Sequence, residues 1–178
     1  MEGHLAVAGT EAERIASLEY SQAARASVVK AYRLAGYLLG DSVEAQDAVQ
    51  DALIKAWQNW DRLRDQESFS PWFDRIVVNV CRDRMRQRGR VRMVDLETAD
   101  GVEASDAFGA MFNRDRLGSA VARLGDDQRI VIALRFWRDL TVDQVAEVLD
   151  VPAGTVKSRL HYALRALRAE LGGSSDEA

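Results

Sequence analysis

The sequence predicts an all-α protein: two small helical domains joined by a flexible acidic linker, the C-terminal one containing a helix-turn-helix. Three observations favour this fold class. Hydrophobic residues make up 47% of the 178 residues and only 2 residues are proline, so most of the chain is expected to pack as helix. Apolar residues recur three and four positions apart along most of the chain. No segment shows the alternating pattern of a strand, and no internal repeat occurs.

The N-terminal domain is predicted to hold three helices, over residues 15–39, 43–60 and 70–92. Gly40 stops the first helix, Asp41 or Ser42 caps the second, and Ser70-Pro71 starts the third, with proline at the first helical position. The first two helices are expected to bury their apolar stripes: Leu18, Ala24, Val28, Ala31, Leu34, Ala35 and Leu38, then Ala45, Ala48, Val49, Ala52, Leu53, Ala56 and Trp57.

Composition assigns the remaining segments. Residues 1–14 show no apolar stripe and are predicted to be a loose lead-in, and the polar residues 61–69 are predicted to be a loop. Residues 93–112 read as an acidic linker, and a second helical domain is expected over residues 113–171, with helices over 113–124 and 127–138. Residues 172–178, which begin Gly-Gly-Ser-Ser, are expected to be a disordered tail.

Residues 141–171 carry the strongest local pattern, two helices joined by a short turn. Thr141 and Gln144 fit a capping box, and Pro152 is expected to end the first helix together with the residues before it. The second helix has an apolar face and an opposite polar face: Thr155, Lys157, Ser158, His161, Tyr162 and Arg165. A basic helix after a tight turn fits the DNA major groove. An ordinary helical hairpin is the alternative, and DNA binding is favoured.

The net charge of −4 conceals an uneven distribution along the chain. Residues 82–92 hold six arginines against Asp83 alone, a local charge of +5, and residues 153–171 carry +3. Residues 93–127 hold eight acids against three arginines, a local charge of −5. Phosphate contact needs local positive charge because salt screens each charge within about 10 Å. Two basic helices separated by an acidic segment are therefore compatible with DNA binding.

Several function classes are excluded by residue counts. Cys81 is the only cysteine and His4 and His161 are the only histidines, so no internal disulfide, metal cluster or catalytic constellation can be assembled. We expect no enzyme, no metal and no cofactor. The apolar neighbours of Cys81 favour a small core residue over a redox sensor. No apolar run is long enough to span a bilayer and the N-terminus lacks a signal pattern, which predicts a cytoplasmic protein.

Three segments, in this order, resemble the conserved elements of the extracytoplasmic-function (ECF) sigma factors, the smallest class of the bacterial sigma-70 family. Residues 45–57 are similar to the helix that binds core polymerase (AQDAVQDALIKAW). Residues 69–84 resemble the region that reads the −10 element (FSPWFDRIVVNVCRDR), and residues 154–160 the −35 recognition helix (GTVKSRL). The resemblance implies a sigma factor with region 2 over 15–92 and region 4 over 113–171. Its implied partners are core RNA polymerase, promoter DNA and an anti-sigma factor.

The resemblance also implies roles for individual side chains. Asp47, Gln50 and Asp51 share one helix face and are expected to meet the clamp helices of the polymerase's largest subunit. The expected −10 contacts come from the loop that captures an unstacked base and from the helix after it: Arg64, Gln66, Ser68, Phe69, Asn79, Arg82 and Arg84. The expected −35 contacts are Thr155, Lys157, Ser158, Arg159, His161 and Tyr162.

Some of these residues have other readings. Asn79 is alternatively a satisfied helix residue, and Val77 and Val78 stand where the family often has a small and then a basic residue. The aromatic residues on apolar stripes are expected in the core rather than as DNA wedges: Trp57, Trp60, Trp72 and Phe73. The competing function is a stand-alone helix-turn-helix regulator whose N-terminal helices bind a ligand or dimerise. This function leaves two features unexplained: the face of Asp47, Gln50 and Asp51, and the six arginines of residues 82–92, here called the arginine block.

Overall fold

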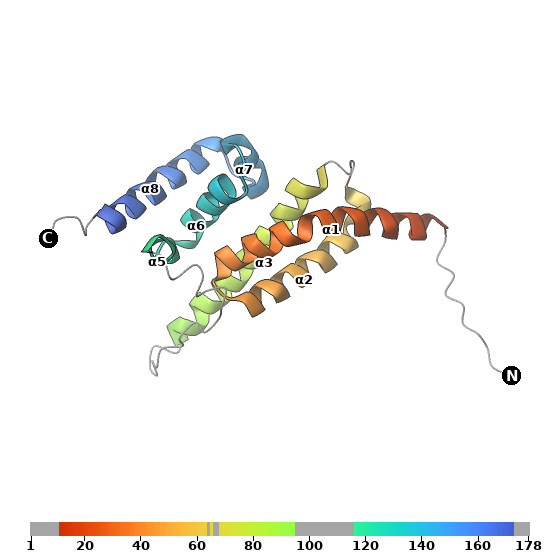
Figure 1. Cartoon of the computed structure of the whole chain (residues 1–178), viewed down its shortest axis with the longest axis horizontal. Coiled ribbons are helices and arrows are strands. Elements are labelled where there is room, and N and C mark those ends of the chain that lie inside the picture. Colours follow the sequence, from red (N-terminus) through yellow and green to blue (C-terminus); the bar gives the residue numbers. More distant parts are fainter. Residues whose placement is uncertain (1–10, 64, 66–67, 95–115, 173–178) are drawn as a thin grey trace.

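The computed structural model describes residues 11–63, 65, 68–94 and 116–172, and every regular element in these ranges is a helix. The order is α1 (Glu11–Leu39), α2 (Ser42–Gln58), the 3-10 turn η1 (Trp60–Arg62), α3 (Phe69–Val94), α5 (Arg116–Ala122), α6 (Asp126–Ile132), the π-helical segment η4 (Ala133–Trp137), α7 (Val142–Leu149) and α8 (Ala153–Gly172). Figure 1 shows α1, α2 and α3 as one bundle and α5 to α8 as a second group. Residues 95–112 of the expected linker and residues 173–178 of the expected tail lie outside the described residues.

The N-terminal bundle packs small residues of α2 against larger ones of α1 and α3. The fully buried side chains include Leu34 and Leu38 of α1 and Phe73 and Val77 of α3. Alanines fill the facing side of α2, so its backbone can approach its neighbours closely: Ala45, Ala48, Ala52 and Ala56. At the other end of the bundle the Tyr20 hydroxyl donates to the Leu53 carbonyl over 2.6 Å. The packing of the three helices buries most of the apolar stripes that the sequence predicted for α1 and α2.

Helix ends in the N-terminal bundle mostly follow the sequence signals. Gly40 adopts φ +70°, which ends α1, and Asp41 caps α2 by accepting a hydrogen bond from the Glu44 amide over 2.8 Å. Three boundary predictions are wrong. Helix α1 starts at Glu11, inside the predicted lead-in, because its first-turn acids favour a helix N-terminus and an Arg14–Glu11 pair adds support. Helix α3 starts at Phe69 with Ser70 inside it, and η1 forms within the predicted loop.

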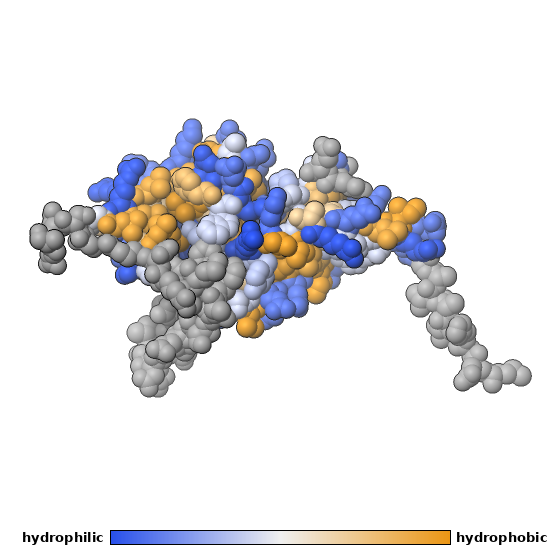
Figure 2. Space-filling view, in the orientation of Figure 1, coloured by the Kyte–Doolittle hydropathy of each residue, from blue (hydrophilic) through white to orange (hydrophobic). Residues whose placement is uncertain are grey.

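Two residues expected in the core lie on the surface instead. Leu18 of α1 is 65% exposed and Trp57 of α2 is 45% exposed, although the Trp57 ring packs edge-on against Tyr20. Helix α1 runs past the end of the bundle, so its first turns have no neighbour on one side. Ile15 and Leu18 in these turns are 48% and 65% exposed. Figure 2 shows hydrophobic surface over this end of α1.

The helix-turn-helix of the C-terminal group has the predicted geometry. Thr141 and Gln144 form a complete capping box at the start of α7, and Asp150 ends that helix in the left-handed conformation at φ +55°. Helix α8 then buries Val156, Leu160 and other apolar residues of its inner face. The predicted helix over 127–138 is instead α6 followed by the π-helical η4, in which Phe136 and Trp137 are 59% and 45% exposed.

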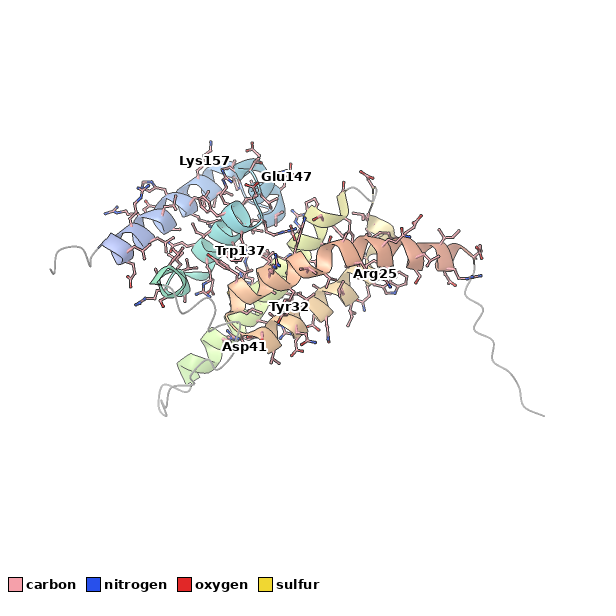
Figure 3. The ribbon with its side chains drawn as sticks, in the orientation of Figure 1. Arg25, Tyr32, Asp41, Trp137, Glu147 and Lys157 are labelled. Atoms are coloured by element: carbon pink, nitrogen blue, oxygen red, sulfur yellow. The ribbon has the colours of Figure 1, made fainter. Side chains whose placement is uncertain are left out.

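The two groups of helices pack against each other, and arginines at this interface reach the carbonyl ends of helices. Arg75 of α3 donates to the Glu147 and Val148 carbonyls at the end of α7, over 2.8 and 3.3 Å. Arg129 of α6 likewise donates to the Leu38 carbonyl of α1 over 3.0 Å. The last carbonyls of a helix lack intrahelical partners and attract cations, so these contacts are favourable. Glu147 and Trp137 are labelled at this junction in Figure 3.

A buried ion pair lies at the centre of the same interface. Arg138, after η4, donates to Oδ2 of Asp74 on α3 from both Nη2 and Nε, over 2.5 and 3.0 Å. Both side chains are at least nine-tenths buried. Burial raises the pKa of the Asp74 carboxyl, and the Arg138 charge opposes that shift. No local sequence pattern predicted this interface.

Cys81 has the position that the sequence predicted, fully buried on α3. Burial raises the pKa of its thiol from 9.0 to about 12, with Arg84 opposing the shift, so the thiol is protonated at neutral pH. We expect a disulfide reagent to modify Cys81 only in denaturant, as followed by thiolate absorbance. Because the folded-state pKa is raised, this group stabilises the fold below about pH 9 and ceases to as pH rises toward 12. Complete modification of the native protein at neutral pH would contradict this.

Two general features complete the fold. None of the helices in the described part of the chain is long and apolar enough to cross a membrane. In the same residues no group of three or more His, Cys, Asp or Glu side chains could hold a metal ion.

Candidate functional site

The outer face of α2 combines acidic and apolar side chains. Asp47, Gln50 and Asp51 are all exposed, as expected from their spacing. Val43, Ile54 and Trp57 continue the same stripe and are also exposed, at 66%, 56% and 45%. Apolar side chains grouped on one surface are typical of a protein interface. The sequence predicted Trp57 in the core, whereas the structure places it on this exposed face.

Asp51 is already engaged within the chain. Its Oδ2 accepts a hydrogen bond from Nη2 of Arg84 on α3 over 2.6 Å, and this pair joins α2 to α3. For Asp47 and Gln50 no side-chain partner is recorded among the described residues. The face predicted for the polymerase therefore has one acid that also pairs with α3 and one that is open to a partner.

The helix predicted to read the −10 element presents fewer open side chains than its sequence suggests. Asn79 of α3 is exposed, and its amide has no recorded partner in the described part of the chain. Val77 and Val78 before it are fully buried, so they serve the core. Arg82 pairs with Asp127 of α6 and Arg84 with Asp51.

The loop before α3 is only partly described. Arg64 and Gln66 lie outside the described residues, and Ser68 is exposed with its amide donating to the Asp65 carbonyl over 3.1 Å. Phe69 is buried in an aromatic cluster, stacked on Phe73 at 5.3 Å between ring centroids. In this conformation the Phe69 ring cannot form a wall for an unstacked base. Trp60 and Trp72 are partly buried against the core, as predicted.

Four arginines of the arginine block of α3 pair with acids, three of which come from α2 or α6 and one from α3 itself. Besides Arg82 and Arg84, Arg86 lies 4.0 Å from Asp83. Arg88 forms an ion pair with Glu44 and donates to the Leu39 carbonyl over 2.8 Å. Burial and the nearby Arg129 lower the pKa of Arg88, and Asp41 opposes that shift. The local charge counted along the sequence therefore overstates the charge that this helix offers to DNA.

The outer face of α8 is open and carries most of the residues predicted for the −35 element. Lys157 projects from the far side of α8 in Figure 3 and has no ion pair among the described residues. The rings of His161 and Tyr162 are exposed and meet edge-on at 5.5 Å. The Ser158 hydroxyl donates to the Thr155 carbonyl over 2.9 Å, and Thr155 is half-buried. Arg159 differs from the others because it points to α6, where it pairs with Asp127 at 2.6 Å.

The structure thus exposes three surfaces: the acidic and apolar face of α2, the Asn79 side of α3 and the outer face of α8. The unanticipated residues are Asp127, which touches arginines of two helices, and the exposed apolar residues of α2. For Asp127 no sequence signal exists, because its partners lie 45 and 32 positions away. For α2 the signal was present: Val43, Asp47, Gln50, Ile54 and Trp57 recur at helical spacing on one side.

Comparison with known proteins gives two family matches and many relatives. The sequence model of Sigma-70 region 2 matches residues 25–91, and that of Sigma-70, region 4 matches residues 120–169. The chain is 33% identical to the ECF RNA polymerase sigma factor SigW of Bacillus subtilis, over 80% of this chain and 83% of that protein. It is 34% identical to the ECF RNA polymerase sigma factor SigL of Mycobacterium tuberculosis, over 79% and 81%.

Two solved structures share the fold. The sigma factor RpoE, in complex with the anti-sigma factor NepR from Bartonella quintana, has a TM-score of 0.68 and 24% identity, covering 87% of this chain and 98% of that chain. CnrH, in complex with the cytosolic domain of CnrY, has a TM-score of 0.63 and 24% identity, covering 88% and 89%. At this identity the likeness shows the fold of the helices alone.

Proposed function

The chain belongs to the ECF sigma factors of the sigma-70 family, and from this premise we propose which surfaces bind polymerase and promoter. Helix α2 binds core RNA polymerase at its clamp helices, α3 with the loop before it reads the −10 element, and α8 reads the −35 element. The protein promotes melting by holding unpaired bases and performs no covalent chemistry itself. It works in the cytoplasm, where polymerase and promoter DNA are found.

The observation that carries this proposal is the pairing of both family matches with three exposed faces in the matched regions. The face of α2 offers Asp47 and Gln50 beside Val43 and Ile54, a mixture that suits a protein partner with basic and apolar groups. The face of α8 offers Lys157 and His161 on a helix that follows a tight turn, which suits the major groove.

An anti-sigma factor is the third partner that we propose. Both solved relatives are in complex with a second protein, an anti-sigma factor in the case of RpoE. The exposed apolar residues of this chain lie on both groups of helices, including Phe136, Trp137 and Val43. A partner that covers them would compete with polymerase.

The stand-alone regulator is the less favoured function because it gives no role to the α2 face. Run-off transcription distinguishes the two. Purified chain, core RNA polymerase from the same cell and a library of genomic promoters should give transcripts that neither protein gives alone. Binding to specific DNA without any polymerase-dependent transcript would support the regulator instead.

Asn79 gives a residue-level test of the −10 assignment. A side-chain amide reads a base edge, so Asn79→Ala is expected to relax the preference at one −10 position by about 1–3 kcal/mol. A randomised −10 library transcribed by the holoenzyme measures this preference. Gln87→Ala, an exposed amide two turns further along α3, is the matched control and should keep it.

Lys157→Ala provides the contrasting behaviour. It should weaken promoter binding evenly across sequences. It should also lower the slope of log affinity against log salt by about 1, if Lys157 contacts phosphate.

For Asn79, an identical −10 preference of wild type and Asn79→Ala would remove this residue from the set of base-reading residues.

A further inference from the structure

Asp127, in the first turn of α6, lies between two helices that the proposed function assigns to promoter DNA. Its Oδ2 lies 2.6 Å from Nη2 of Arg159 on α8. Its Oδ1 lies 3.7 Å from Nη2 of Arg82 on α3. One carboxylate therefore links an arginine of the −10 helix to an arginine of the −35 helix, and it does so across the interface between the two groups of helices.

This geometry cannot coexist with promoter binding by both helices. The −35 and −10 elements are separated by roughly two turns of duplex, on the order of 70–80 Å. In the structure both guanidinium groups lie within 4 Å of the same carboxylate. The two groups of helices must separate before Arg82 and Arg159 can reach their elements together.

The contact also satisfies its arginines poorly. Nε of Arg82 and Nη1 of Arg159 are buried without an acceptor among the described residues. Arg82 approaches Asp127 only at ion-pair distance, beyond the range of a hydrogen bond. Each arginine faces only one oxygen of the shared Asp127 carboxylate, whereas a DNA phosphate offers it more acceptor oxygens. Phosphate can therefore displace Asp127 from both arginines.

We propose that the Asp127 contact is autoinhibitory: the free factor closes on itself, and Asp127 masks one arginine of each promoter-reading helix. The inference rests on the proposed function, because the masking has meaning only if α3 and α8 meet DNA. The ion pair of Asp74 with Arg138 and the Arg75 contacts to α7 support the closed arrangement around it. Polymerase and promoter together would hold the open arrangement.

The test measures binding of the free, full-length chain to a short duplex of mixed sequence, by fluorescence anisotropy over a range of salt. Asp127→Ala is expected to raise affinity about three- to tenfold at low salt, since the arginines of two partly buried pairs are released. It should also steepen the plot of log affinity against log salt by up to about 2, because each freed arginine releases nearly one counterion.

Asp126→Ala is the matched control. It removes the same charge from the same helix turn, and Asp126 has no ion pair among the described residues. The control should leave the salt slope unchanged. Equal affinities and equal slopes for the two variants would overturn the masking proposal.

A second readout separates this inference from the proposed function. Wild type and Asp127→Ala should both support run-off transcription with core polymerase, since the holoenzyme is already open. If neither gives a transcript, the sigma-factor assignment of these surfaces fails. If both give transcripts and Asp127→Ala binds free duplex no better than Asp126→Ala, only the autoinhibitory role fails.

Discussion

Reversing the charge of Asp47 and Asp51 together is expected to abolish association with core RNA polymerase. Both carboxylates are exposed on α2, where a basic partner surface would meet them. Two lysines there would place like charges across the interface, which costs several kilocalories per mole and reduces association by at least about a hundredfold. Co-purification of tagged core polymerase with the Asp47→Lys/Asp51→Lys chain measures the loss directly.

The change at Asp51 needs a folding control, because its carboxylate pairs with Arg84 over 2.6 Å in the folded protein. Circular dichroism and thermal unfolding of the double variant should stay close to wild type, since the pair is partly exposed and contributes little. Glu19→Lys/Asp143→Lys changes the net charge equally, at exposed positions on α1 and α7, and should still bind polymerase. Undiminished co-purification of the α2 variant would show that this helix is not the polymerase-binding surface.

Arg138→Met is expected to have the largest effect on stability, about 3–5 kcal/mol at neutral pH. Arg138 is the partner of the buried Asp74 carboxylate, and its removal leaves that charge without compensation. The molecule can limit the cost by separating the two groups of helices, which hydrates Asp74. We therefore expect a lower midpoint in denaturant and a larger radius of gyration in X-ray scattering.

The pH dependence identifies the cause. The pKa of Asp74 is already raised above 3.8 by burial, and loss of Arg138 raises it further. A raised carboxyl pKa means that stability is highest below the ordinary value and falls as pH rises through the folded-state pKa. The deficit of Arg138→Met should thus shrink toward pH 4. Asp74→Asn/Arg138→Met, which has no carboxylate there, should lack this trend. A compact Arg138→Met chain with wild-type stability would exclude the pair as a support of the interface.

Local signals predicted the helical architecture well because they act within one or two turns. The capping box of Thr141 and Gln144 and the left-handed Gly40 are found where the sequence placed them. The start of α1 was missed because the apolar stripe begins only after its first turn, while Glu11 and Glu13 already favour helix. The exposure of Leu18 was missed because periodicity reports a face and cannot report whether a neighbour covers it.

Contacts between distant residues were beyond the reach of the sequence. The six arginines of residues 82–92 predicted a strongly basic helix, and four of them meet acids: Arg82, Arg84, Arg86 and Arg88. Asp51 and Glu44 lie on α2 and Asp127 on α6, far along the chain from their arginines, whereas the Asp83 partner of Arg86 lies three residues away on α3 itself. Asp74 did carry a signal, an acid on a stripe of buried residues, because such a charge requires a partner from another element.

The burial of Cys81 makes this chain convenient for distance measurement. A thiol that stays protonated and enclosed will not compete for maleimide dyes, so the native sequence needs no cysteine removal. Cysteines introduced at the exposed positions Gln46 on α2 and Ala169 on α8 would then accept a donor and an acceptor fluorophore selectively. Single-molecule energy transfer between them would report the spacing of the two helical groups, one molecule at a time, as polymerase is added.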